Sequence, residues 1–213
     1  MHFPHLLNGR SGSVGKVYSR WHAGIVFAGG TFVSTGPLLG TTFYTCGPAA
    51  VATLLTYYYS IPTTEAEALE LAEGFMRAQD LEPAKGINAL ALKQTLEAKG
   101  ILTKGFRVKP EALKDYFDRG GLPLIAHLTE PQKHFVVVVG FVGDQVVLGD
   151  PSWGRRTIPF SAFVKEHGYS EIVLVPLPSD LEIVRSAKER QKATLEWAAD
   201  RLAHLANLRE GLP

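Results

Sequence analysis

The sequence lacks the features that would place it in several common protein classes. It has one cysteine among 213 residues, so it forms no internal disulfide and needs no oxidising compartment to fold. Its 22 basic and 21 acidic side chains give a net charge of +1, so no charge excess indicates binding to nucleic acid or to an anionic membrane. Its most lipid-like stretch, residues 23–33, is too short to span a bilayer.

The beginning of the chain also lacks the pattern of a secretory signal. Residues 1–10 have no charged start followed by a long apolar core. A cytoplasmic location is therefore the expectation for the sequence as written.

The composition that remains is that of an ordinary globular protein. With 46% hydrophobic and 20% charged residues, the chain is long enough for one good core and an appendage. Residues 1–20 are rich in glycine and serine and predict a loop, and residues 24–34 predict a β-hairpin that turns at its central glycine pair. We therefore divide the chain into this loop, a folded domain over residues 21–178 and a helical extension over residues 179–213.

Helix signals dominate the first half of the domain, and strand signals dominate the second. An apolar run of helix formers follows Cys46. Further on, Thr64 and Glu67 form a capping box, and Asn88 can cap a third helix. Apolar runs of strand length come next, and the longest is apolar throughout after its first residue, which predicts burial on both faces. Expected strands are residues 101–108, 122–128, 134–140, 145–148 and 171–175, with short helices at 110–120 and 160–167. This order indicates an α+β fold with an antiparallel sheet.

The C-terminal extension carries a different pattern. Its apolar residues recur at three- and four-residue steps, which predicts one amphipathic helix. We expect the face that carries Leu195, Leu202 and Leu205 to be covered, either by the domain or by a second copy in a homodimer. Lys188 and Gln191 interrupt the apolar stripe, which weakens the homodimer interpretation.

The stretch most suggestive of chemistry is residues 44–50, which contain the single cysteine, Cys46. Gly47-Pro48 suits a helix start, because the N–H that proline lacks has no partner in a first turn. Cys46 is therefore predicted at a helix N-terminus, where unpaired N–H groups and the helix dipole favour an anion. A thiol at such a position ionises more readily, and the thiolate is a nucleophile. The alternative is that Cys46 is a small buried hydrophobe, a common fate of free cysteines.

A cysteine nucleophile needs a base, and the base needs an orienting partner. His134 begins the buried strand and Asp150 ends the return strand, so both can reach a cleft where the strands leave the core. Each residue also has a simpler explanation, since a histidine at a strand start is often a surface residue and an aspartate before proline is often a turn former.

The register of the hairpin decides whether these two side chains can meet. A plain two-residue turn at Gly143-Asp144 would set Asp150 opposite Val137, on the wrong face relative to His134. A three- or five-residue loop, or a single bulge, would restore the same face. The catalytic hypothesis therefore requires an irregular hairpin, for which the glycines at positions 140 and 143 are suited.

Three motifs in this order resemble the bacteriocin-processing, or double-glycine, cysteine peptidases, which have a papain-like fold. The motifs are residues 45–50 with 52–55, residues 134–137 with Gly140, and Asp150-Pro151 with Gly154. The resemblance covers about residues 41–175. It implies cleavage of a peptide after a Gly-Gly leader, with Cys46 as nucleophile, His134 as base and Asp150 as the orienting carboxylate. No cofactor and no metal ion are expected.

One position departs from the family pattern. The family usually has a glutamine six residues before the cysteine, as a donor to the oxyanion, and this sequence has Gly40 there. Losing one oxyanion donor costs about 2.7–4 kcal/mol of transition-state stabilisation. The remaining candidate donors are the backbone N–H of Cys46, the hydroxyl of Thr42 and the amide of Gln132.

The expected function is therefore a thiol peptidase acting on a peptide or protein substrate at small residues. A catalytically weak or inactive module that binds glycine-rich leader peptides is one alternative, and a thiol acyltransferase is another. The sequence has no Gly-x-x-x-x-Gly-Lys loop and no membrane span, so we expect a domain without the ATP-driven exporter that many relatives carry.

Overall fold

The computed structural model describes residues 25–28, 31–34 and 45–210. Strands β1 (Ile25–Ala28) and β2 (Thr31–Ser34) pair antiparallel and form a separate two-stranded sheet. The strands of the predicted hairpin are thus confirmed, and its glycine turn lies outside the described residues.

The helical half begins at Cys46, as the sequence predicts. Its elements are α1 (Cys46–Thr53), the π-helical turn η1 (Leu54–Tyr58), α2 (Glu65–Arg77), the 3₁₀ turn η2 (Pro83–Lys85) and α3 (Ala89–Ala98). Both predicted caps form: Thr64 Oγ1 accepts from the Glu67 N–H at 3.1 Å, and Asn88 Oδ1 accepts from the Ala91 N–H at 2.8 Å. These bonds satisfy N–H groups that have no partner inside the first turn of α2 and of α3.

The second half forms a six-stranded antiparallel sheet with the strand order β3-β8-β4-β5-β6-β7. Its strands are β3 (Thr103–Arg107), β4 (Leu124–Leu128), β5 (His134–Val142), β6 (Gln145–Asp150), β7 (Gly154–Pro159) and β8 (Tyr169–Pro176). Two short helices, α4 (Pro110–Asp118) and α5 (Phe160–Lys165), lie between strands. The sequence analysis did not predict β7, because its two adjacent arginines break the apolar–polar alternation by which a strand is recognised.

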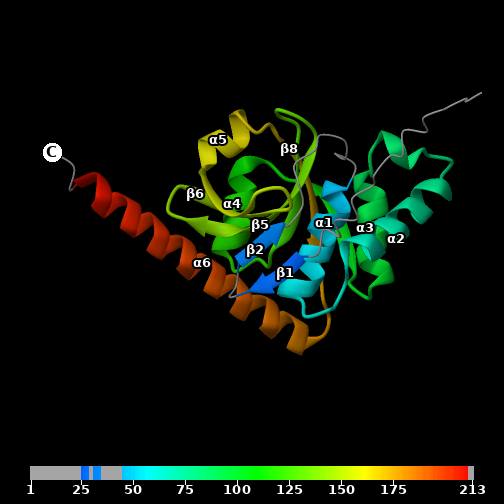
Figure 1. The fold of residues 1–213 in the computed structure, drawn as a ribbon, viewed down its shortest axis with the longest axis horizontal. Helices are drawn as coiled ribbons and strands as arrows, with labels where there is room; N and C mark the ends of the chain where they lie inside the picture. The colour runs from blue at the N-terminus through cyan, green and yellow to red at the C-terminus, as the bar shows by residue number, and fades with distance from the viewer. Residues whose placement is uncertain (1–24, 29–30, 35–44, 211–213) are drawn as a thin grey trace, which may run out of the picture.

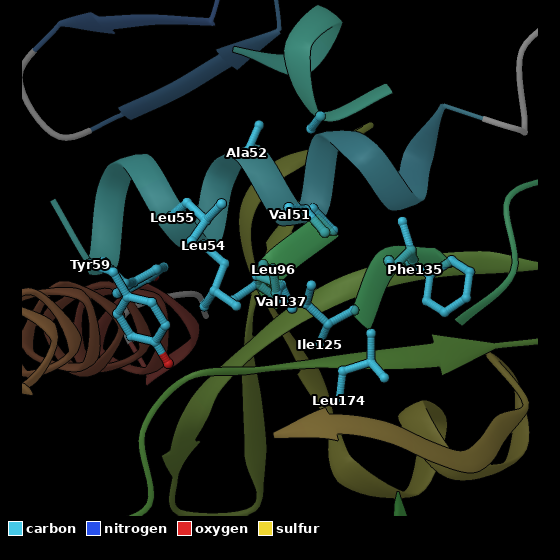
Figure 2. Packing of buried hydrophobic residues seen from close by; sticks show 14 of the residues in the cluster. Val51, Ala52, Leu54, Leu55, Tyr59, Leu96, Ile125, Phe135, Val137 and Leu174 are labelled. Atoms are coloured by element: carbon cyan, nitrogen blue, oxygen red, sulfur yellow. The ribbon is translucent and has the colours of Figure 1, made fainter. Parts of the chain in front are cut away.

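The sheet has a hydrophobic core on each face, with helices α1 to α3 grouped on one side of it (Figure 1). On that side Leu54 and Leu55 pack with Val137, as Figure 2 shows. On the other side Val136 and Val138 pack in a second cluster with residues of α4 and α5. The predicted burial of β5 on both faces is therefore confirmed, and the α+β order of the fold with it.

The extension forms one helix, α6 (Leu181–Glu210), which runs along the domain and extends past it at its C-terminal end (Figure 1). Ala187 and Ala198 are fully buried, and Leu195 packs against the core. Leu205 is 46% exposed, so the domain does not cover this end of the apolar face. At Leu205 the helix already extends past the domain on which its earlier turns pack (Figure 1). Among the described residues no helix is both long and apolar enough to cross a membrane.

Gly47 in the first turn of α1 provides a test of how tightly the helices pack. A Cβ at this position would lie 2.7 Å from Cδ1 of Leu92, a buried side chain of α3. We expect Gly47→Ala to lower the free energy of unfolding by about 1–3 kcal/mol, the usual cost of overpacking. Urea unfolding measures the change.

Gly74 in α2 is the matched control, because a Cβ there would meet nothing within 4 Å. In a helix interior, Gly74→Ala should stabilise the protein by up to about 1 kcal/mol. Equal stability of the two variants would contradict the packing argument.

Candidate active site

Cys46 is the first residue of α1, at the N-terminus where the sequence predicts it. The next seven residues of the helix are buried, whereas Cys46 is only half-buried. The buried-hydrophobe alternative therefore does not describe this cysteine, since its side chain keeps access to the surface.

His134 and Asp150 lie on neighbouring strands and contact each other. His134 Nε2 donates to Asp150 Oδ1 at 2.9 Å. The pairing of β5 with β6 shifts by one residue between Val138 and Gly140, and Val137 then lies across from Gly149. Asp150 therefore follows on the face that His134 shares, which confirms the predicted irregular hairpin.

His134 also contacts Cys46, so the three side chains form one connected group. Burial alone would lower the pKa of His134, but hydrogen bonds to Asp150 and Cys46 and the charges of both residues raise it to about 9. The side chain of His134 is 15% exposed and that of Asp150 is fully buried. The group thus has one end at the surface and its carboxylate inside the protein.

Arg156 is a further member of this group that the sequence analysis missed. Its Nη2 lies 2.8 Å from Asp150 Oδ2, while the Ser152 N–H donates to Oδ1 at 2.9 Å. Burial raises the pKa of Asp150, but the hydrogen bond from His134 and the charges of His134 and Arg156 lower it overall. Gly154 pairs with Asp150, so Arg156, two residues further along β7, is the diagonal neighbour of Asp150 on the same face of the sheet. This neighbour could be found from the sequence only if β7 and its pairing with β6 were known.

A pocket of 640 Å³ opens beside Cys46. Its other described lining residues are Ala84, Lys85, Gly86, Ile87, Asn88, Ala89, His127, Gln132, Lys133, Phe135 and Ile172. His127 Nδ1 lies 2.9 Å from Ser170 Oγ, and the ring centroids of His127 and Phe135 are 4.8 Å apart. Burial lowers the pKa of His127, and the charges of Lys133 and His134 lower it further. The pocket therefore offers a second imidazole for which the sequence analysis proposed no role.

The candidate oxyanion donors are only partly placed by the structure. Gln132 is exposed and lines the same pocket as Cys46. The backbone N–H of Cys46 belongs to the first turn of α1. Thr42 and Gly40 lie outside the described residues. Within residues 45–210 and the two N-terminal strands, no group of three His, Cys, Asp or Glu side chains could hold a metal ion.

The pKa values of the His134–Asp150 pair predict how stability depends on pH. The folded protein raises the pKa of His134 from about 6.5 to about 9, so this stabilisation is complete below about pH 6.5 and is lost as the pH rises through about 9. For Asp150, whose pKa is lowered, the stabilisation is lost as the pH falls through its folded pKa. We expect the free energy of unfolding, measured by urea titration, to decrease across the alkaline window.

The variant His134→Gln should lose that alkaline decrease. His204→Gln, at an exposed position on α6, should retain it and serves as the control. If His134→Gln kept the full decrease, His134 would not be the group that titrates there.

A half-buried cysteine at a helix start, joined to a histidine–carboxylate pair on an antiparallel sheet, is the arrangement of the papain-like cysteine peptidases. A sequence model of the Peptidase C39 family matches residues 40–180, which is more than half of the chain. The chain therefore belongs to the Peptidase C39 family. The family resemblance and the papain-like fold class predicted from the sequence are confirmed.

Two curated relatives show how far the sequence similarity extends. The chain is 30% identical over 135 residues to the probable functional amyloid protease FapD of Pseudomonas aeruginosa, covering 62% of this chain and 56% of FapD. It is 33% identical over 135 residues to the lactococcin-G-processing and transport ATP-binding protein LagD of Lactococcus lactis, covering 17% of LagD. The chain thus spans little more than half of one relative and a small part of the other.

Solved structures show the same domain. A double glycine motif protease from an AMS/PCAT transporter, in complex with its leader peptide, matches with a TM-score of 0.53 and 28% identity, over 67% of this chain and 90% of the other. The peptidase domain of Streptococcus ComA matches in fold with a TM-score of 0.54 and 24% identity, over 67% of this chain and 96% of that domain.

Proposed function

We propose that this protein is a thiol-dependent peptidase that cleaves peptides after small residues of the Gly-Gly leader type. Cys46 is the nucleophile, His134 the base and Asp150 the carboxylate that orients His134. The observation that carries this proposal is the continuous contact from Cys46 through His134 to Asp150 beside a pocket.

In the proposed reaction the thiolate of Cys46 attacks the carbonyl carbon of the scissile peptide, and the carbonyl electron pair moves to the oxygen. With a pKa of about 9, His134 holds a proton at neutral pH and can give it to the leaving amine. His134 then takes a proton from water, which attacks the thioester carbonyl and releases Cys46 as thiolate. The backbone N–H of Cys46 and the amide of Gln132 are the described candidates to stabilise the oxyanion.

Asp150 supports this reaction through its two oxygens. Oδ1 accepts from His134 and so fixes the orientation of the ring, while Oδ2 is paired with Arg156. Because the carboxylate is buried, it stabilises the imidazolium in a medium where charges interact strongly. Arg156 in turn keeps the carboxylate ionised.

The substrate class is proposed from the relatives and the pocket together. The similar double glycine motif protease was crystallised with a leader peptide, while FapD and LagD are named for different substrates. The chemistry that they share is peptide cleavage, so we propose a peptide or protein substrate with a small-residue cleavage site and name no particular cargo.

Labelling with a peptide chloromethyl ketone that ends in Gly-Gly tests the proposal. Because the chain has one cysteine, the mass of the peptide that contains Cys46 in a digest distinguishes alkylation of the thiol from alkylation of a histidine. We expect rapid alkylation at neutral pH and much slower alkylation of the His134→Ala variant, since that variant lacks the base. A module that only binds leader peptides would bind the peptide but react no faster than a free thiol. With a Gly-Gly peptide substrate in place of the ketone, an acyltransferase would pass the acyl group from Cys46 to an added amine, giving an amide in preference to the hydrolysed acid.

A further inference from the structure

Helix α6 follows the part of the chain that matches the family, yet it contacts β5, which carries His134, and β7, which carries the Asp150 partner Arg156. The family match ends at residue 180, and α6 begins at Leu181. Its side chains reach two places on the sheet: the bulge in β5 and the edge strand β7.

The bulge in β5 determines which face of the sheet Asp150 occupies. Val142 pairs with Gln145 at the turn, and a regular ladder from there would set Asp150 across from Val137. The extra residue at Val139 moves Asp150 by one position, onto the face of His134. The contact between these two side chains therefore depends on a single irregular residue.

The backbone carbonyl of Val139 takes its hydrogen bond from α6. Gln191 Nε2 donates to this carbonyl at 2.8 Å and to the carbonyl of Gly121 at 2.9 Å, so both amide hydrogens are used. Gln191 is 6% exposed. On the β4 side, the register that pairs Leu124 with Val138 would bring Pro123 opposite Val139, and proline has no N–H to donate.

Two further contacts of α6 hold the same region. A Cβ at Gly140, the residue after the bulge, would lie 3.1 Å from Cδ2 of Leu195, so α6 packs closely on this glycine. On β7, the guanidinium of Arg155 lies over the ring of Trp197 at 4.3 Å, while the next residue, Arg156, pairs with Asp150 on the other face.

We propose that Gln191 is a positioning residue of the peptidase site. By donating to the carbonyl of Val139, it stabilises the bulge that brings Asp150 onto the face of His134. The proposal rests on the proposed function of the Cys46–His134–Asp150 group, and it assigns the C-terminal helix a part in the site that the family match does not include.

The test compares Gln191→Met with Lys188→Met. Both side chains reach from α6 to backbone carbonyls at Gly120 or Gly121, but only Gln191 reaches Val139. Methionine matches glutamine in length, is one atom shorter than lysine, and removes the donors of both. Two measurements are made: NMR titration of the His134 ring protons, which gives its pKa, and steady-state kinetics with a Gly-Gly peptide, which gives kcat and KM.

For Gln191→Met we expect the pKa of His134 to fall toward its ordinary value and kcat to drop roughly 10- to 100-fold with KM little changed, since a displaced catalytic group loses orientation. Lys188→Met should leave both quantities near those of the parent protein. Equal pKa values for His134 in the two variants would overturn the proposal, and a merely structural role would lower the melting temperature without moving this pKa.

Two provisions keep the test decisive. If Gln191→Met does not fold, Gln191→Asn is measured in its place, because its amide is one methylene too short to span both carbonyls. If the parent protein cleaves no peptide, the proposed function fails, yet the NMR titration still decides whether Gln191 controls the His134–Asp150 contact.

Discussion

Replacing Cys46 by alanine is expected to abolish cleavage of a Gly-Gly peptide, with a loss of about 10⁶-fold in kcat or to below detection. The thiolate is the only proposed group that forms the covalent intermediate, and His134 cannot replace it from its place beside Asp150. Cleavage is followed by chromatography and mass spectrometry of the products.

Binding of the same peptide separates this loss of chemistry from a loss of structure. The dissociation constant of Cys46→Ala, measured by calorimetry, should stay within a few-fold of the parent value, because alanine removes one atom from the pocket wall. Cleavage by Cys46→Ala at the parent rate would disprove the assignment of the nucleophile. Unchanged binding combined with a parent protein that cleaves nothing would favour the leader-binding module.

The second large effect is expected for Asp150→Asn. This change keeps the size of the side chain but removes the charge that stabilises the imidazolium of His134 and that pairs with Arg156. We expect kcat to fall by up to about 10⁴-fold, the loss in a serine triad whose orienting aspartate becomes asparagine. The pKa of His134, about 9 in the parent protein, should fall as well.

Asp144→Asn is the control for Asp150→Asn, because it makes the same chemical change at an exposed position in the turn of the same hairpin. It should leave both kcat and the pKa of His134 unchanged. If Asp150→Asn retained parent turnover, Asp150 would have a structural part and no role in orienting the base.

The parts of the fold that the sequence predicts well are those set by local chemistry. A helix start at Cys46, the caps at Thr64 and Asn88, and the apolar strand that His134 begins all follow from the types of neighbouring residues. The bulge could also be anticipated, because the catalytic hypothesis requires His134 and Asp150 to lie on the same face of the hairpin, and a regular two-residue turn would place them on opposite faces.

The parts that the sequence did not predict depend on contacts between distant segments. Strand β7 is polar, so its pairing with β6, and the position of Arg156 beside Asp150, have no local signal. Gln191 looks like an interruption of an apolar stripe, whereas in the fold its amide is buried against two carbonyls. A polar residue on an apolar face indicates a hydrogen-bond partner, but the sequence does not say where the partner lies.

The homodimer considered from the sequence stays a prediction. Pairing through α6 would cover Leu205 and Leu208, which are 46% and 53% exposed.

The bulge at Val139 also restricts how the hairpin can change length during evolution. Within the paired parts of β5 and β6, each single insertion or deletion between His134 and Asp150 turns one of the two side chains to the opposite side of the sheet. A lineage that loses the bulge must therefore gain or lose one more residue in the same hairpin to keep its histidine–aspartate contact. Changes at the turn itself leave the pairing of the two strands and that contact intact, so the length of this loop is free to drift.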